Sequence, residues 1–366
     1  MALTRTYLVR IICGLVLFFS GCTTHLNNDV DVKNEIMQVA SRFATGDKTG
    51  LQEIEGGLSD SEVYVFKSRE GQRYVLKKGG SWPGRDGKLM ELALHKFCST
   101  NGISPKLLYV DDEKNPKIVV MDYIDGKLLA RQDFYNEELL DNIVKNLRCL
   151  HSMPINPTFK KRTLLSELKA SVARVKKKNL ALPSKFDGWC KYLFELLSKL
   201  ESTAMVQCHC DLSSRNILIE NRKKVYFIDF QCTLRGNPLF DIAHLLYKLD
   251  LNDEEILRKI LRKYLGREAT TAEIKRIFFY ESVAAFIAGQ FRLQWLKNTT
   301  TAELDKFMSQ ATISSSHYLE KGDLRKKEFQ TLSQRDKIEY VLSFFKDFLR
   351  FGKEAGISFN EEVDRD

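Results

Sequence analysis

Apolar residues follow a helical spacing near the start of the folded part and an alternating spacing after it. Within residues 34–44, Ile36, Val39, Ala40 and Phe43 fall on one helical face. After two glycines the pattern changes to short β-rich runs. We predict strands at 62–67, 72–77, 106–110 and 117–123, a hairpin turn at 68–71 and an amphipathic helix at 88–100.

From residue 133 onward, helical periodicity dominates. We predict helices at 136–152, 163–179, 187–204, 252–265, 271–297, 302–320 and 335–353, interrupted by a strand-rich island at 216–230 whose turn is 221–224. The pattern predicts an α+β protein with two lobes, a small β-rich N-lobe and a larger helical C-lobe. Its segments are a leader (1–22), a linker with an N-terminal helix (23–50), the N-lobe (51–124), the C-lobe (125–325) and a helical C-terminal tail (326–366).

The length of 366 residues fits two lobes better than one core, and the composition, 43% hydrophobic and 29% charged, is that of a globular protein. The formal net charge of +9 suits phosphate-bearing ligands, an anionic membrane surface or nucleic acid. No Arg-rich run with interleaved aromatics occurs, and Lys176–Lys177–Lys178 is typical of a solvated helix face. We therefore expect no nucleic-acid partner.

The first residues have the features of a targeting segment. Arg5 and Arg10 precede the apolar run 11–19, which is far shorter than the roughly 20 residues that span a bilayer. The small residues before Cys22 resemble the lipobox of bacterial lipoproteins, although Phe19 stands where that motif usually has Leu. We predict a lipoprotein-like signal peptide with membrane attachment through Cys22; an upstream mis-start or a simple hydrophobic cap is the alternative.

Six further cysteines lie inside the globular part, without the dense spacing of a disulfide scaffold. They are typical of buried thiols in a reducing compartment, and ATP is scarce outside the cytoplasm. Location therefore stays open between a membrane-anchored lipoprotein and a cytoplasmic protein. The pair Cys208 and Cys210 suggests zinc, because alternate residues of an extended segment share a face. No second Cys/His pair at ligand spacing exists, so we favour buried thiols.

Three oxygen-bearing side chains, Asp211, Asn216 and Asp229, carry the candidate chemistry. Phosphoryl transfer needs Mg²⁺ bridging the phosphates, a residue orienting the acceptor hydroxyl, and cations on the phosphate tail. An Asp, an Asn five residues on and an Asp at the end of the next hairpin strand meet that need. The first carboxylate faces the hydroxyl, while the amide oxygen and the second carboxylate are hard ligands for Mg²⁺.

The string His209-x-Asp211-x-x-x-x-Asn216 with Asp229 resembles the catalytic core of the aminoglycoside phosphotransferase and choline/ethanolamine kinase superfamily, relatives of the protein kinases. The string Phe240-Asp241-Ile242-Ala243 is also typical of it. The resemblance spans roughly residues 50–320 and implies a protein-kinase-like fold that uses ATP and Mg²⁺. It implies that Asp211 is the catalytic base and that Asn216 and Asp229 hold the metal. It also implies that His209 is structural and that Asp241 braces the catalytic loop.

In the N-lobe the resemblance extends to the nucleotide site. Gly56, Gly57 and Ser59 resemble a phosphate-covering loop in which backbone N–H groups approach phosphate oxygens. The resemblance also implies that Lys77 contacts the α/β-phosphates, with Lys78 as its rival on the opposite strand face, and that Glu91 forms a positioning ion pair. Residues 121–124 match the hinge that binds adenine, so Met121 and Tyr123 are its predicted members.

The implied activity is transfer of the ATP γ-phosphate to a small-molecule hydroxyl, first of all that of a choline- or ethanolamine-like amino alcohol. An aminoglycoside or another sugar hydroxyl is the first alternative, and a non-catalytic nucleotide-binding module displayed on a membrane is the second. After the string that ends at Ala243, choline kinases usually continue with Asn-His-Phe and an acidic residue. This chain has His244 and Leu245 there, so the acidic-aromatic signature of the substrate site is incomplete. Tyr280, Glu281 and Trp295 are candidates for a cation pocket, with simple packing as the alternative.

Overall fold

The computed structural model describes residues 36–43, 50–54, 61–68, 70–79, 84–111, 118–155, 162–201, 205–251, 253–310, 324 and 326–357. These residues form two compact units. The first contains the described residues up to Leu129 together with Ser214–Thr233, and the second contains Ala130–Ser213 and the residues from Leu234 onward. The predicted signal peptide, Cys22, Gly56, Gly57 and Ser59 lie outside the described residues.

The first unit is built on a five-stranded antiparallel sheet in the order β1-β2-β3-β5-β4. Its strands are β1 (Gln52–Glu53), β2 (Glu62–Lys67), β3 (Arg73–Lys78), β4 (Leu107–Val110) and β5 (Ile118–Asp122). The alternating pattern of the sequence fixes which residues share a face, because successive side chains of a strand point to opposite sides. The four longer strands are the predicted ones, with ends that differ by one residue.

Each face of this sheet has an apolar cluster. On one face Phe66, Leu76 and Val120 pack with Ile36 and other residues of the helical segment 36–41. The predicted N-terminal helix is therefore present in its described part and covers the sheet. On the other face Val63, Val75 and Met121 form a second cluster. That second face leads to the candidate site, because Lys77 alternates in phase with Val75.

A second small sheet completes the first unit. It contains β6 (Gly126–Leu128), β8 (Ile217–Glu220) and β9 (Lys224–Phe227), paired antiparallel in the order β6-β8-β9. The hairpin of β8 and β9 was predicted from the sequence. Strand β6 was not predicted, because three residues are too few to show an alternating pattern. Pairing of β8 with β6 is the reason why Ser214–Thr233 belongs to the first unit, whereas the predicted boundaries placed these residues with the C-lobe.

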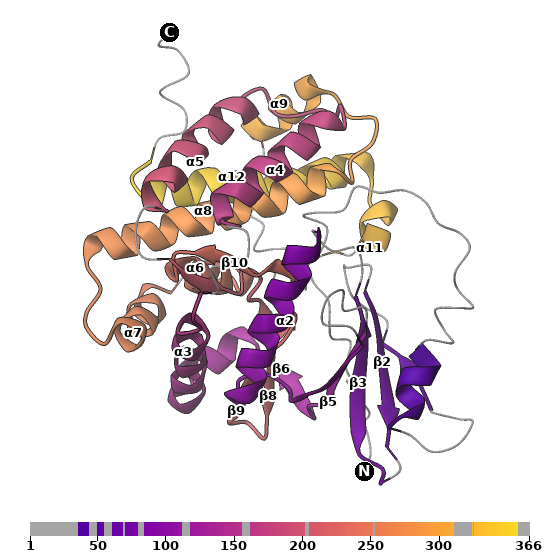
Figure 1. Ribbon diagram of the computed structural model, residues 1–366. Coiled ribbons are helices and arrows are strands. Elements are labelled where there is room, and N and C mark those ends of the chain that lie inside the picture. Colours follow the sequence, from indigo (N-terminus) through magenta and orange to yellow (C-terminus); the bar gives the residue numbers. More distant parts are fainter. Residues whose placement is uncertain are drawn as a thin grey trace, which may run out of the picture. The chain divides into compact units, whose positions relative to one another are not determined.

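Helix α2 (Gly84–Thr100) lies beside this hairpin in Figure 1 and contacts the short helix η3 (Phe230–Cys232) that follows it. The predicted helix began at residue 88, one turn later than observed. In α2, Met90, Leu94 and Cys98 recur every four residues and are buried. The same helix carries Glu91 and His95. One amphipathic helix therefore supplies both core packing and two titratable side chains of the site.

The second unit is mainly helical. Its elements are η1 (Arg131–Tyr135), α3 (Glu137–His151), α4 (Leu164–Lys177), α5 (Phe186–Leu200), β7 (Val206–Cys208), β10 (Leu234–Gly236), α6 (Leu239–Lys248), α7 (Glu254–Leu265), α8 (Thr271–Leu293), α9 (Thr301–Gln310), α11 (Lys326–Thr331) and α12 (Gln334–Glu354). The predicted helix 271–297 ends at Leu293, and the predicted helix 302–320 is described only to Gln310. The other predicted helices match within two residues, or within four for 187–204.

Helix α6 was missed by the sequence analysis, although Asp241 within it was singled out. The polar residues Asp241, His244 and Lys248 share one helical face, so a helical spacing was present, but only over ten residues. Nine of these ten residues are buried. The long α8 is also buried along most of its length. It contacts α6 and α12, and Figure 1 shows α8 and α12 side by side.

The segment predicted as a C-terminal tail contributes to the core of the second unit. Phe345 of α12 packs against Phe286 of α8 at 5.7 Å between ring centroids and stacks on Trp189 at 5.8 Å. Phe348 packs against Phe286 at 5.2 Å. Such aromatic pairs add to the burial of apolar area. Residues 334–354 are therefore an integral part of this unit.

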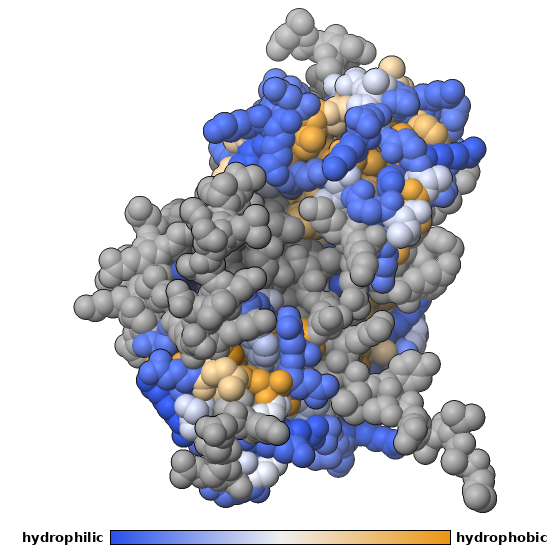
Figure 2. Space-filling model, turned by 90° about the vertical axis from the view of Figure 1, so that its right-hand side faces the viewer, coloured by the Kyte–Doolittle hydropathy of each residue, from blue (hydrophilic) through white to orange (hydrophobic). Residues whose placement is uncertain are grey.

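The described surface is mainly polar. On the face shown in Figure 2, hydrophilic residues dominate and apolar residues occur in small groups between them. Among the described residues, the large apolar side chains that are exposed are Met37, Tyr135 and Ile155. None of the helices in the described ranges combines the length and the apolar character that a membrane span requires.

The close approach of β6 to β8 generates a stability prediction. A Cβ atom at Gly126 would lie 2.6 Å from the backbone oxygen of Ile219, which belongs to the paired strand. Gly126→Ala should therefore lower the free energy of unfolding by about 1–3 kcal/mol, as overpacking does, measured by urea denaturation. Lys127→Ala, an exposed change on the same strand, should alter it by less than about 0.5 kcal/mol. Equal stability of Gly126→Ala and the parent would contradict this close approach.

Candidate active site

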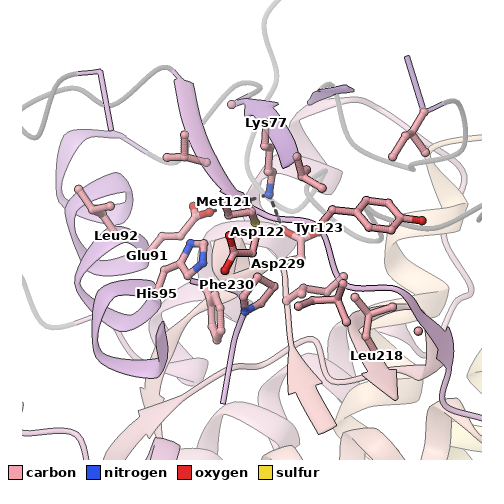
Figure 3. Close-up of a pocket in the computed structure, with 18 of the residues that line it drawn as sticks. Lys77, Glu91, Leu92, His95, Met121, Asp122, Tyr123, Leu218, Asp229 and Phe230 are labelled. Carbon is pink, nitrogen blue, oxygen red and sulfur yellow. Dashed lines mark hydrogen bonds and ion pairs between the residues drawn. The ribbon is translucent and has the colours of Figure 1, made fainter. Parts of the chain in front are cut away.

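The first unit contains a pocket between β3, β5, α2 and the hairpin strand β8. Its apolar walls include Val75, Val119, Met121, Leu218 and Ile228. Figure 3 shows the ionisable side chains of Lys77, Glu91 and Asp229 close to one another in this pocket. An apolar slot with a few converging polar groups is the usual form of a small-molecule site. It suits a ligand with a flat apolar ring and a charged end.

Lys77 is the central cation of this pocket. Its Nζ lies 2.9 Å from Oδ1 of Asp229 and 3.9 Å from Oε1 of Glu91. The side chain is almost fully buried, whereas Lys78 is only partly buried and its neighbour across β5 is Ile118. Strand alternation thus places Lys77, and not its rival, on the face that lines the pocket. The predicted pairing partner, Glu91, is within reach of it.

Burial governs the protonation of two side chains of α2 at this site, those of Glu91 and His95. It raises the pKa of Glu91 to about 8, although the charge of Lys77 acts in the opposite direction. His95 follows one helical turn later; burial, reinforced by the charge of Lys77, lowers its pKa to about 4. Its ring lies 5.3 Å from that of Phe230. His95 was not among the site residues predicted from the sequence; its i, i+4 spacing from Glu91 on the predicted helix was the signal that could have identified it.

The strand β9 is followed by Ile228 and then by Asp229. Asp229 has a left-handed backbone with φ 64° and ψ 70°. Aspartate tolerates this region better than most residues, and such conformations cluster at functional sites. Its Oδ1 binds Lys77, while its buried Oδ2 has no hydrogen-bond donor among the described residues. A buried carboxylate oxygen without a donor fits a cation ligand.

Asn216 is held next to Asp229 by the hairpin. The backbone N–H of Ile228 donates to the carbonyl oxygen of Asn216 at 3.0 Å, and Ile217 pairs with Phe227 one residue further along. Asn216 is fully buried. The hairpin register therefore brings the amide and the Asp229 carboxylate to one end of the same ladder. These are hard oxygen donors of the kind that Mg²⁺ accepts, so the residues present fit a divalent metal.

The predicted hinge residues lie on the opposite wall. Met121 ends the buried part of β5 and lines the pocket, and Tyr123 follows the strand and also lines it. The guanidinium of Arg73 covers the Tyr123 ring at 4.1 Å, and the Tyr123 N–H donates to the Arg73 carbonyl oxygen. Both contacts hold the segment after β5 against β3. The structure thus places these side chains at the pocket; their contact with adenine stays a prediction.

Asp211 belongs to the second unit, in a loop that follows β7. His209 and Asp211 are both buried, and the Asp211 N–H donates to Nδ1 of His209 at 3.3 Å. His209 therefore makes a backbone contact within the loop, as a structural residue would. His244 Nδ1 donates to the carbonyl oxygen of Leu212 at 2.8 Å. Burial, reinforced by the charge of Lys248, lowers the pKa of His244 to about 3, so this imidazole is neutral.

Asp241 binds this loop through several hydrogen bonds. It accepts the backbone N–H of His209 at 2.8 Å and that of Cys210 at 2.7 Å, and it contacts Nε2 of His151 at 3.0 Å. Burial alone would raise its pKa, but the hydrogen bond and charge of His151, together with the other donors, lower it. Asp241 is therefore an ionised carboxylate that fixes the backbone on the N-terminal side of Asp211.

The three candidates for a cation pocket lie inside the second unit. Tyr280 and Trp295 are buried and pack on other rings, at 5.8 Å from Phe240 and 5.4 Å from Phe329. Glu281 is buried too, and burial raises its pKa well above the usual value. For Tyr280 and Trp295 the structure shows packing, which was the alternative interpretation.

Comparisons with known proteins agree with this fold. A family model described as the phosphotransferase enzyme family matches residues 50–276. A protein LicA homolog from Metamycoplasma hominis is 25% identical over 193 residues, which are 52% of this chain and 70% of that protein.

Two solved structures share the fold at low sequence identity. The choline kinase LicA from Streptococcus pneumoniae has a TM-score of 0.56 at 16% identity, covering 76% of this chain and 96% of that chain. The amicoumacin kinase hAmiN, in complex with AMP-PNP, Ca²⁺ and Ami, has a TM-score of 0.61 at 15% identity, covering 92% and 99%. The predicted two-lobed, kinase-like α+β fold is confirmed.

The raised pKa of Glu91 predicts a pH dependence of stability. Between pH 6.5 and 8 the folded state holds a proton on Glu91 that the unfolded state has released, so stability falls as pH rises. His95 opposes this slope weakly near pH 6.5, where its imidazole is partly protonated only in the unfolded state, but it does so equally in the parent and in a Glu91 variant. Glu91→Gln should remove about 1 kcal/mol of this loss, measured by urea denaturation at both pH values.

The exposed change Glu255→Gln is the matched control and should leave the pH slope unaltered. A Glu91→Gln protein with the same slope as the parent would show that Glu91 is ionised throughout this range.

Proposed function

Because the chain belongs to the phosphotransferase enzyme family, as its match over residues 50–276 shows, we propose that it transfers the γ-phosphate of ATP to the hydroxyl of a choline- or ethanolamine-like amino alcohol. Membership of this family establishes the general activity, that of a small-molecule kinase whose acceptor is an alcohol and whose co-substrate is ATP. The acceptor, the choice of Mg²⁺ and the role of each residue are our proposals.

The buried contact of Lys77 with Asp229 and Glu91 is the observation that carries the chemistry. The ammonium group of Lys77 neutralises phosphate oxygens, and Glu91 keeps the lysine directed into the pocket. Asp229 and Asn216 would hold Mg²⁺ through their oxygens. When bound, this ion would supply positive charge that offsets the negative charge of the phosphates. The apolar walls around Val75 and Met121 take the adenine ring.

Asp211 is the proposed base. Its carboxylate accepts the proton of the acceptor hydroxyl as the oxygen–phosphorus bond forms, and ADP leaves with the electron pair of the broken bond. The backbone of Asp211 is fixed by His209, and the preceding residues by Asp241. A base must be held in one orientation to work efficiently, and these hydrogen bonds supply that restraint.

Similarity to the LicA homolog and the string Phe240–Ala243 support an amino alcohol as acceptor. The amicoumacin kinase, whose fold covers most of this chain and whose name gives a different acceptor, supports keeping the second candidate, an aminoglycoside or another sugar hydroxyl. A non-catalytic module on a membrane is the weaker alternative, since Asp211, Asn216 and Asp229 all have competent side chains. Attachment through Cys22 rests on the sequence pattern alone.

Replacing the base should separate chemistry from binding. Asp211→Ala should lower turnover by about 10²–10⁴-fold with nucleotide affinity unchanged, because a lost general base removes a transition-state contact. Coupled ADP-release assays and equilibrium titration with a fluorescent nucleotide measure the two quantities. Asp187→Ala, an exposed carboxylate on α5, should change neither. Full turnover in Asp211→Ala would exclude the assigned role.

The acceptor is tested by a panel of choline, ethanolamine, thiamine, homoserine and aminoglycosides in the same ADP-release assay. We expect choline or ethanolamine to give the highest kcat/KM, with a phosphorylated product visible by mass spectrometry. Turnover with aminoglycosides alone would replace the first proposal by the second candidate. ADP release stimulated by no member of the panel would remove the amino-alcohol proposal.

A further inference from the structure

Beneath the loop that carries Asp211, the second unit brings together side chains that the proposed reaction does not use as reactants. Nε2 of His151, Sγ of Cys208 and a carboxylate oxygen of Asp241 all lie within 4.8 Å of one another, and all three residues are buried. They come from the end of α3, from β7 and from α6. A nitrogen, a sulfur and an oxygen donor therefore converge from three separate segments.

Cys210 lies next to this group, but its sulfur is not among the atoms that converge within 4.8 Å. The thiols of Cys208 and Cys210 hydrogen-bond to each other, so their sulfur atoms are close. Cys210 has a left-handed backbone with φ 63°, which is unusual for a residue with a Cβ atom. That backbone strain is maintained by the hydrogen bond from the Cys210 N–H to Asp241. With Cys210 included, the candidate donors are two sulfurs, one imidazole nitrogen and one carboxylate oxygen; the Cys210 sulfur has to move toward the other three to join them.

The surroundings of these donors resemble the outer shell of a metal site. Nδ1 of His151 is hydrogen-bonded to the hydroxyl of Tyr264 at 2.7 Å, which orients Nε2 toward Asp241. Metal-bound histidines almost always have such a partner on the other ring nitrogen. Asp241 accepts two backbone N–H groups, and each carboxylate oxygen has two lone pairs. Asp241 can therefore bind a cation and keep both of those hydrogen bonds.

We propose that Cys208, Cys210, His151 and Asp241 form a binding site for a thiophilic divalent cation of the Zn²⁺ type. Once the Cys210 sulfur moves toward the three converging donors, four donors of this kind match the tetrahedral preference of Zn²⁺. Thiolate ligands select against Mg²⁺, which accepts oxygen donors. Binding releases the two thiol protons to solvent and replaces the contact of His151 with Asp241 by two bonds to the metal, with no change in oxidation state.

The metal would connect α3, β7 and α6 at the base of the Asp211 loop. It would thus stabilise the folded state without contacting a substrate, and the proposal does not depend on the identity of the acceptor. Sequence spacing alone did not reveal the site, since His151 and Asp241 lie far from the Cys-x-Cys pair in the chain. Only the packing of the three segments supplies the third and fourth ligands.

Cobalt is the probe of choice for the experiment, because a thiolate-to-cobalt charge-transfer band reports sulfur ligation and intense visible bands report tetrahedral geometry. The full chain, reduced and stripped of metal, should take up one Co²⁺ with both signals, and one equivalent of Zn²⁺ should displace it. Zn²⁺ should also raise the thermal midpoint of unfolding in a concentration-dependent way, as any ligand of the folded state does.

Cys208→Ser and Cys210→Ser should each weaken Co²⁺ binding by at least about tenfold and reduce the charge-transfer intensity. His151→Gln keeps a donor for Asp241 but loses the imidazole ligand, and it should weaken binding similarly. Cys149→Ser and Cys190→Ser change thiols of the same unit outside the cluster and are the matched controls. They should bind Co²⁺ like the parent.

Three results would overturn the proposal: no charge-transfer band in the reduced parent, an unchanged band in Cys208→Ser and Cys210→Ser, or loss of the band in the control variants. Circular dichroism of each variant shows whether it is folded. If one serine variant fails to fold, the other serine variant and His151→Gln decide the question.

Discussion

The active-site part of the first unit depends on the buried contact of one ammonium group with two carboxyl groups. Lys77 lies within 4 Å of both Asp229 and Glu91, in a pocket with apolar walls. Removing such charges from water is costly, and losing one partner of a buried pair typically costs about 3–5 kcal/mol. The contact therefore fixes β3, α2 and the end of β9 relative to one another. Those three elements define the pocket.

The same apolar surroundings determine which groups of this cluster carry a charge. Burial makes Glu91 a weak acid and His95 a weak base, so Lys77 is the principal cation there and Asp229 its principal counter-charge. An arrangement fixed before the ligand arrives costs no reorganisation during reaction. Oδ2 of Asp229, which has no donor among the described residues, is the atom that such an arrangement offers to a metal.

Two buried aspartates illustrate how environment separates roles. Asp229 has one oxygen bound by Lys77 and one without a donor among the described residues, whereas Asp241 is satisfied by two backbone amides and His151. The first is suited to binding and the second to holding backbone. The left-handed conformation of Cys210 persists because Asp241 binds its N–H. Strain of this kind is kept only where the surrounding contacts determine it.

The sequence by itself determined the elements with clear periods and the chemistry with fixed local spacing. Alternation in β3 placed Lys77 on one face, and the hairpin between Asn216 and Asp229 brought these two to the end of one ladder, because both depend on short-range geometry. Tertiary structure decided what local pattern does not encode. The polar residues Asp241 and His244 of α6 are buried, which the local pattern does not show, and the approach of His151 to Asp241 and Cys208 depends on how α3, α6 and β7 pack. Residues distant in the chain become neighbours only when apolar surfaces are buried together.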